Sequence, residues 1–217
     1  MSARIPQPLD LYSGGLLNYL AHLYFSESRP LAWAGALMGD FVKGRRFDGL
    51  PDDLVMHLQL HRALDAYTRI SVPFQRSRRR LDPALSHGRS VIVDVFYDHF
   101  LACYWRDYSP CPLPDFAQQV YAGLMDCHDV LHPRLQQQLP QMMARDWLTS
   151  YQRPEVVKRV LERLSQRLNH KLDLVGGFAA LTTGRDALEE DFRSFMAGAA
   201  PYLQQWKAER LATGEGS

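Results

Sequence analysis

This sequence of 217 residues has few cysteines and no long apolar run. Its three cysteines, Cys103, Cys111 and Cys127, are odd in number and lack CxxC spacing. They predict reduced thiols of a cytosolic protein and exclude a disulfide framework or a cysteine-based zinc site. No stretch reaches the roughly 18 apolar residues that a membrane span needs. We also expect no signal peptide, because no basic start precedes an apolar region.

The chain also has almost no net charge, and it lacks the common catalytic motifs. Lys and Arg number 25 and Asp and Glu 24, which gives a formal net charge of only +1. No overall field therefore marks a nucleic-acid-binding protein. The motifs GxSxG, GxGxxG, HExxH and the P-loop do not occur, so the chemistries that they carry have no support.

Clear period-2 strands are absent too, whereas helical patterns recur along the chain. We predict an all-α, single-domain bundle of about eight to ten helices over residues 16–211, between a loose arm (1–15) and a disordered tail (212–217). A helix that runs from about residue 135 to 151 should be interrupted at Pro140. Four other predicted helices carry the polar residues of interest, at residues 16–24, 31–42, 51–70 and 89–105.

The most informative stretch is Val55 to Asp65, VMHLQLHRALD. His57, His61 and Asp65 recur at every fourth position, so in a helix they share one stripe. Such a stripe presents metal ligands or a proton relay, although a solvated face with incidental histidines is the simpler alternative. His57 and Asp65 lie about 12 Å apart along the helix axis, so only an adjacent pair of the three can bind one ion.

Similar residues stand in apolar surroundings on the neighbouring predicted helices. Asp40 lies in LMGDFV, and a buried carboxylate needs a cation or a hydrogen-bonding partner. Gly35 and Gly39, four residues apart, allow a neighbouring backbone to approach closely, and Gly44 is a candidate C-cap. The remaining members of this group are His22, Asp94, Asp98 and His99. Imidazole and carboxylate ligands suit Mn²⁺ or Mg²⁺.

Four blocks in this order resemble the acyl carrier protein phosphodiesterase family, which is similar to HD-type metal-dependent phosphohydrolases. The blocks span roughly residues 18–110 and read NYLAHL (18–23), GDFVKG (39–44), HxxxHRxxD (57–65) and DxxxDHF (94–100). The resemblance implies a helical, manganese-dependent enzyme that removes the 4′-phosphopantetheine arm from holo acyl carrier protein. HD-type enzymes use an adjacent His-Asp pair, whereas this sequence has Asp98-His99 in reverse order.

The resemblance also directs our choice of site residues. We predict metal ligands among His22, Asp40, His57, His61 and Asp98, and catalytic groups among Asp40, His61, Asp65, Asp94 and His99. Lys43 and Arg62 are candidates for the phosphodiester oxygens, with helix-surface ion pairing as the alternative. The basic run Gln75 to Arg80 should dock the acidic carrier protein through Arg76, Arg78, Arg79 and Arg80, unless it is an ordinary solvated face.

Three alternative functions stay open at this point. An HD-type phosphohydrolase acting on small nucleotides would need no exposed basic helix. A non-catalytic carrier-protein-binding module would show no metal-dependent turnover. An RNA-binding helical protein has weak support, because the basic run is short and lacks interleaved aromatic residues.

Overall fold

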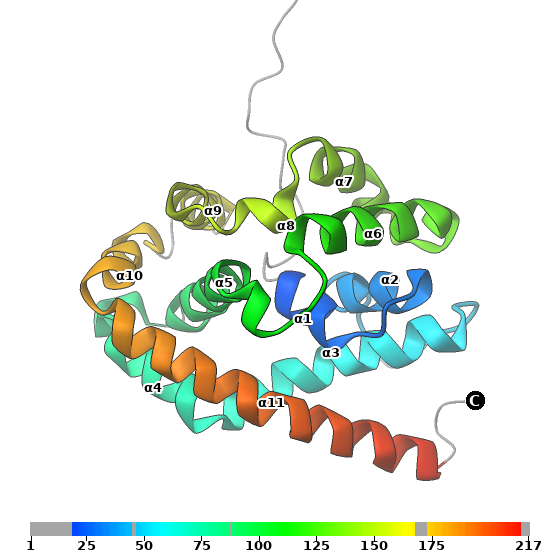
Figure 1. Ribbon diagram of the computed structural model, residues 1–217, viewed down its shortest axis with the longest axis horizontal. Coiled ribbons are helices and arrows are strands. Elements are labelled where there is room, and N and C mark those ends of the chain that lie inside the picture. The colour runs from blue at the N-terminus through cyan, green and yellow to red at the C-terminus, as the bar shows by residue number, and fades with distance from the viewer. Residues whose placement is uncertain (1–18, 45–46, 87, 168–172, 214–217) are drawn as a thin grey trace, which may run out of the picture.

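The computed structural model describes residues 19–44, 47–86, 88–167 and 173–213, and the predicted arm and residues 214–217 of the predicted tail lie outside them. Within these ranges the chain forms one helical domain with eleven α-helices and no strand, which confirms the all-α prediction (Figure 1). The helices are α1 (Tyr19–Phe25), α2 (Pro30–Met38), α3 (Asp52–Ile70), α4 (Val72–Arg80), α5 (Gly88–Cys103), α6 (Leu113–Asp126), α7 (Pro133–Ala144), α8 (Trp147–Ser150), α9 (Pro154–Arg167), α10 (Ala179–Thr183) and α11 (Arg185–Thr213). None of these described helices is both long and apolar enough to cross a membrane.

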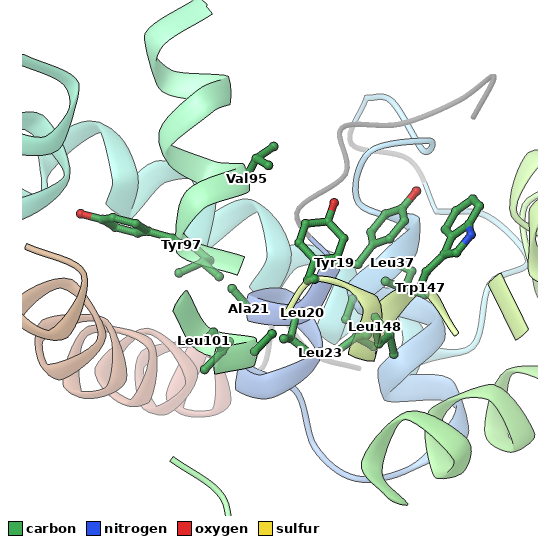
Figure 2. Packing of buried hydrophobic residues seen from close by; sticks show 14 of the residues in the cluster. Tyr19, Leu20, Ala21, Leu23, Leu37, Val95, Tyr97, Leu101, Trp147 and Leu148 are labelled. Atoms are coloured by element: carbon green, nitrogen blue, oxygen red, sulfur yellow. The ribbon is translucent and has the colours of Figure 1, made fainter. Parts of the chain in front are cut away.

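A single apolar core joins the short N-terminal helices to the rest of the bundle. Leu20 and Leu23 of α1 are fully buried, and Figure 2 shows them among side chains of α2, α5 and α8. The long helix α11 covers α4 and part of α3 on one side of the molecule (Figure 1). This packing places α1, α2, α3 and α5 next to one another in the interior.

Two glycines let α2 lie directly against α3, as the sequence predicted. A Cβ atom added to Gly35 would lie 2.2 Å from the carbonyl oxygen of Leu54, and one added to Gly39 would lie 2.2 Å from Cγ of His61. Real Cβ atoms do not approach other atoms so closely, so any larger residue at either position would push the helices apart. The close packing brings the end of α2 to the middle of α3.

The predicted end of the second helix, with its C-cap, is wrong. Helix α2 ends at Met38 instead of residue 42, because the amides of Phe41 and Val42 both bond back to the carbonyl of Met38 and close the helix. Gly44 does adopt a left-handed conformation (φ 82°), but in the loop and not as a C-cap. The turn sets Asp40 outside the helix and facing α3.

The predicted interruption at Pro140 is also wrong. Pro140 lies inside α7 and is exposed, so water can solvate the carbonyl that its missing N–H would have bonded. The chain instead breaks at Asp146, which is left-handed (φ 44°) and separates α7 from α8.

Candidate active site

Four side chains from three segments meet in the interior. His22 of α1 and His61 of α3 are 3% exposed, and their rings stack with centroids 3.6 Å apart. Asp65, one turn after His61, places one carboxylate oxygen 3.5 Å from Nε2 of His22 and the other 3.4 Å from Nε2 of His61. Asp40, just after α2, places Oδ1 3.6 Å from the same Nε2 of His61. We call these four residues the His/Asp cluster.

The surrounding backbone fixes the orientation of both imidazoles. Nδ1 of His61 lies 2.7 Å from the carbonyl oxygen of Ala36. A carbonyl only accepts, so Nδ1 carries a proton, and Nε2 faces the carboxylates. The carboxylate of Asp98 on α5 accepts hydrogen bonds from the amides of Leu20 (2.8 Å) and Ala21 (2.9 Å), which caps α1 and holds His22 in place.

The donor set of the cluster fits a divalent cation. Ligand atoms of His22, His61 and Asp65 all lie within 4.8 Å of one another. Nε2 of His61 and Oδ2 of Asp40 are buried without a hydrogen-bond partner, which is costly unless something else satisfies them. The distances of 3.4–3.6 Å are long for hydrogen bonds but close to the roughly 3.0–3.4 Å between neighbouring ligands on one ion.

Without a cation, the imidazole pair holds one additional proton, which His61 carries. Burial and the charge on His61 lower the pKa of His22 to about 3. Burial alone would also lower the pKa of His61, but the carboxylates of Asp40 and Asp65 outweigh it and raise the pKa to about 10. A divalent cation that bound here would compete with that proton.

Asp94 of α5 and Arg78 of α4 lie at the edge of the cluster. Burial, followed by the charges of Asp65, Asp98 and Asp40, raises the pKa of Asp94 well above its ordinary value, and the charge of Arg78 acts in the opposite direction. Arg78 is half-buried, donates to Oε1 of Gln75 (2.6 Å), and has a buried Nε without a partner. No ion pair within 4 Å involves Arg78 in the part of the chain that the structure describes, so its charge faces the cluster without a neutralising carboxylate.

Three predicted site residues lie elsewhere and have other partners. His57 lies with Nδ1 2.9 Å from the carbonyl of Asp53 and accepts a long bond (3.4 Å) from the amide of Glu27. Nδ1 of His99 bonds the carbonyl of Tyr151 (2.7 Å). The carboxylate of Asp98 is occupied by the amides at the start of α1. The geometry therefore gives no support to the predicted roles of His57, His99 and Asp98 as ligands or catalytic groups.

The two predicted phosphate-binding residues meet at the loop after α2, which contains Lys43 and is contacted by Arg62 of α3. Arg62 donates to the carbonyls of Val42 (2.6 Å) and Gly44 (2.7 Å), and its guanidinium lies over the ring of Phe47. Arg62 therefore holds the loop in place instead of facing the cluster. Lys43, inside that loop, is exposed, and its role in phosphate binding stays a prediction.

The basic run on α4 also has a different role from the predicted one. Arg76 and Arg80 bond the two carboxylate oxygens of Asp191 on α11 through Nε, at 2.7 and 2.9 Å, and Ser77 adds a longer bond of 3.3 Å. Asp191 is only 1% exposed. Two of the four predicted docking arginines thus attach α4 to α11, and Arg78 faces inward. Of these four, Arg79 alone is exposed and has no ion pair with another described residue.

We expect Asp191→Asn to lower the free energy of unfolding by about 2 kcal/mol, the typical value of hydrogen bonds to a charged group. The substitution keeps the shape of the side chain but removes the charge that Arg76 and Arg80 share. Urea denaturation measures the loss. Glu190→Gln, at the exposed neighbouring position, should change the free energy of unfolding by less than about 0.5 kcal/mol. Equal stability of the two variants would show that the Asp191 network contributes little.

Comparison with known proteins adds a family match. A family model described as acyl carrier protein phosphodiesterase matches residues 17–199. Proteins named acyl carrier protein phosphodiesterase from Enterobacter sp. (strain 638) and Yersinia pestis are 28% and 27% identical over 180 residues, which is 82% of this chain and 93% of each relative. The protein of that name from Serratia proteamaculans (strain 568) is 28% identical over 204 residues, 90% of this chain and 100% of the relative. No solved structure matches, so the predicted HD-like fold stays untested. The matched segment contains the whole His/Asp cluster, Asp94 and Arg78.

Proposed function

The chain belongs to the acyl carrier protein phosphodiesterase family, and on that basis we propose that it hydrolyses the phosphodiester that links 4′-phosphopantetheine to holo acyl carrier protein. The products are apo carrier protein and the released phosphomonoester. One observation carries this proposal: the matched segment folds so that His22, His61 and two aspartates converge, and Nε2 of His61 and Oδ2 of Asp40 are buried without a hydrogen-bond partner. A cluster of this kind suits hydrolysis of a phosphate ester better than non-catalytic binding.

We propose that His22, Asp40, His61 and Asp65 hold a divalent cation, with Mn²⁺ preferred over Mg²⁺ because two ligands are imidazoles. A divalent cation supplies charge neutralisation at phosphate and lowers the pKa of water. The chain itself orients the ligands: the carbonyl of Ala36 fixes the tautomer of His61. The three free thiols agree with a reducing, cytoplasmic location, which we propose for the protein.

The neighbouring residues complete the chemistry. Arg78 brings a positive charge to the cluster and can form a two-pronged contact with phosphate oxygens. We assign Asp94 the role of general acid, because burial and nearby carboxylates raise its pKa and so favour the protonated carboxyl that would donate to the departing serine oxygen of the carrier protein. Together they would neutralise charge on the phosphate and on the leaving group.

The function is tested by incubating the protein with holo carrier protein and Mn²⁺ and following the mass of the carrier protein. We expect conversion of holo to apo mass, and its loss when EDTA is added. Small phosphodiester nucleotides serve as the competing substrate. Faster turnover of the nucleotides would favour the nucleotide phosphohydrolase, and binding of carrier protein without any loss of mass would favour the non-catalytic module.

Arg78→Gln should lower kcat/KM for holo carrier protein by about 10²-fold, as removal of one charge-stabilising donor commonly does. Arg79→Gln is the matched control, because it removes the same charge from the next residue, which is exposed. The affinity for Mn²⁺ should be the same in both variants, since neither touches a proposed ligand. Similar activities of the two variants would remove Arg78 from the site.

A further inference from the structure

Four arginines that are scattered in the sequence line one hollow at the junction of α8 and α9. The hollow has a volume of about 360 Å³. Its lining consists of Arg145, Trp147, Ser150, Arg153, Val156, Arg159, Val160 and Arg163. We call it the four-arginine hollow. It shares no residue with the His/Asp cluster.

The sequence builds this hollow from two sides. Val156, Arg159, Val160 and Arg163 stand at i, i+3, i+4 and i+7 of α9 and therefore share one face of that helix. Arg145 comes from the turn between α7 and α8, and Arg153 immediately precedes α9. The arginines thus reach the same hollow from two segments, Arg145 and Arg153 from the chain before α9 and Arg159 and Arg163 from α9 itself.

The hollow has a cationic rim and a buried floor. Trp147, Ser150, Val156 and Val160 are each less than 9% exposed, whereas Arg145, Arg153 and Arg159 are exposed and Arg163 is half-buried. The lining residues closest to water are therefore all arginines, and the apolar groups lie beneath them.

Among the residues that the structure describes, no acidic residue lines the hollow. Over the ranges that the structure describes, no ion pair within 4 Å involves Arg145, Arg153 or Arg159. Asp146, the nearest acid in sequence to Arg145, is bonded by the hydroxyls of Tyr121 and Thr149. Positive charges brought together in this way repel one another unless an anion lies between them.

We propose that the four-arginine hollow binds a compact anion that carries two or more phosphate groups. Guanidinium groups match the geometry of phosphate oxygens with paired N–H donors, and several of them can contact adjacent phosphates at once. The volume lies at the lower end of the range for small-ligand pockets, so it suits a compact ligand. Arginines from two segments around one hollow favour such a ligand over an extended acidic surface, which a row of cations along one face would suit better.

Inorganic tripolyphosphate is the probe, and isothermal titration calorimetry at constant ionic strength measures its binding. We expect one site per chain and tighter binding than that of inorganic phosphate. Arg159→Gln should weaken tripolyphosphate binding at least tenfold, and Arg159→Lys, which keeps the charge but not the paired donors, should have a smaller effect. The Tm of free Arg159→Gln should equal or exceed that of the wild type, because one like-charge repulsion is removed.

Two controls make the test specific. Lys158→Gln removes a positive charge from the neighbouring position of α9, which does not line the hollow, and should leave tripolyphosphate binding unchanged. The titration is repeated on Asp65→Asn, so that binding of tripolyphosphate to a cation at the His/Asp cluster is not counted. No binding by the wild type, equal losses in Arg159→Gln and Lys158→Gln, or tighter binding of polyglutamate than of tripolyphosphate would each overturn the proposal. None of these results depends on phosphodiesterase activity.

Discussion

Asp65→Asn should lower kcat/KM for holo carrier protein by about 10³-fold or more, equivalent to about 4 kcal/mol of transition-state stabilisation. Asp65 is the only member of the His/Asp cluster that lies within 4 Å of both imidazoles, with one oxygen toward each Nε2. An amide of the same shape replaces one of these oxygens by an N–H₂ donor, which cannot face a cation. The affinity for Mn²⁺, measured by titration of the metal-free protein, should therefore fall together with activity.

The fold should survive this change. The Asp65 side chain is 43% exposed, and a partly solvated carboxylate contributes little to stability. Circular dichroism should show the same helical content as the wild type. Asp129→Asn, at a fully exposed position, is the control for loss of one negative charge and should keep wild-type activity. Full activity of Asp65→Asn with bound Mn²⁺ would remove the His/Asp cluster from the mechanism.

The fold class and the central helix could be predicted from local pattern alone. The predicted helix from Pro51 to about Ile70 agrees with α3 (Asp52–Ile70), because a proline and two aspartates mark its start and the apolar positions repeat at helical spacing. The break between α7 and α8 could not be predicted in this way. It depends on the left-handed backbone of Asp146, whereas the more obvious signal, Pro140, lies on an exposed face that tolerates it.

Half of the site could be predicted for a similar reason. His61 and Asp65 are four residues apart on one helix, so their proximity follows from helical geometry, and this adjacent pair of the stripe belongs to the His/Asp cluster. His57 stands on the same stripe but bonds the carbonyl of Asp53 within its own helix. Spacing fixes the direction of a side chain and leaves its partner open.

The remaining errors concern contacts between residues far apart in the chain. An aspartate among apolar residues can face a cation, as we propose for Asp40, or the free amides of another helix, as Asp98 does. The local sequence does not distinguish these two cases. Arg76 and Arg80 looked like a free basic surface because Asp191, which pairs with them, is more than 100 residues away. The arginines of the four-arginine hollow were missed for the opposite reason, because they do not form a continuous basic run in the sequence.

Gly39→Ala should reduce both activity and stability, because Gly39 provides the space in which His61 lies. A Cβ atom at this position would be 2.2 Å from Cγ and 2.3 Å from Cδ2 of the His61 ring. The backbone of Gly39 (φ −52°, ψ −34°) is ordinary for alanine, so no backbone strain adds to the clash with the ring. The ring must move by about 1 Å, which would break its bond to the carbonyl of Ala36.

We expect kcat/KM to fall by about 10²-fold, as displacement of a catalytic group by 1 Å can cause. The free energy of unfolding should fall by about 1–3 kcal/mol, the usual cost of overpacking. Gly184→Ala is the control, because its added Cβ would meet only the carbonyl oxygen of Ala180, at 3.4 Å. Thermal unfolding and steady-state kinetics measure both effects.

A double-mutant cycle with His61→Ala tests whether the clash with the ring is the cause. If it is, Gly39→Ala should cost little stability once the imidazole is gone, so the coupling energy between the two positions should reach about 1 kcal/mol or more. Additive effects would instead show that the added methyl group clashes with the backbone of α3. The packing of α2 on α3 would then not depend on the orientation of His61. A coupled result would establish that a residue without a side chain sets the position of a proposed metal ligand.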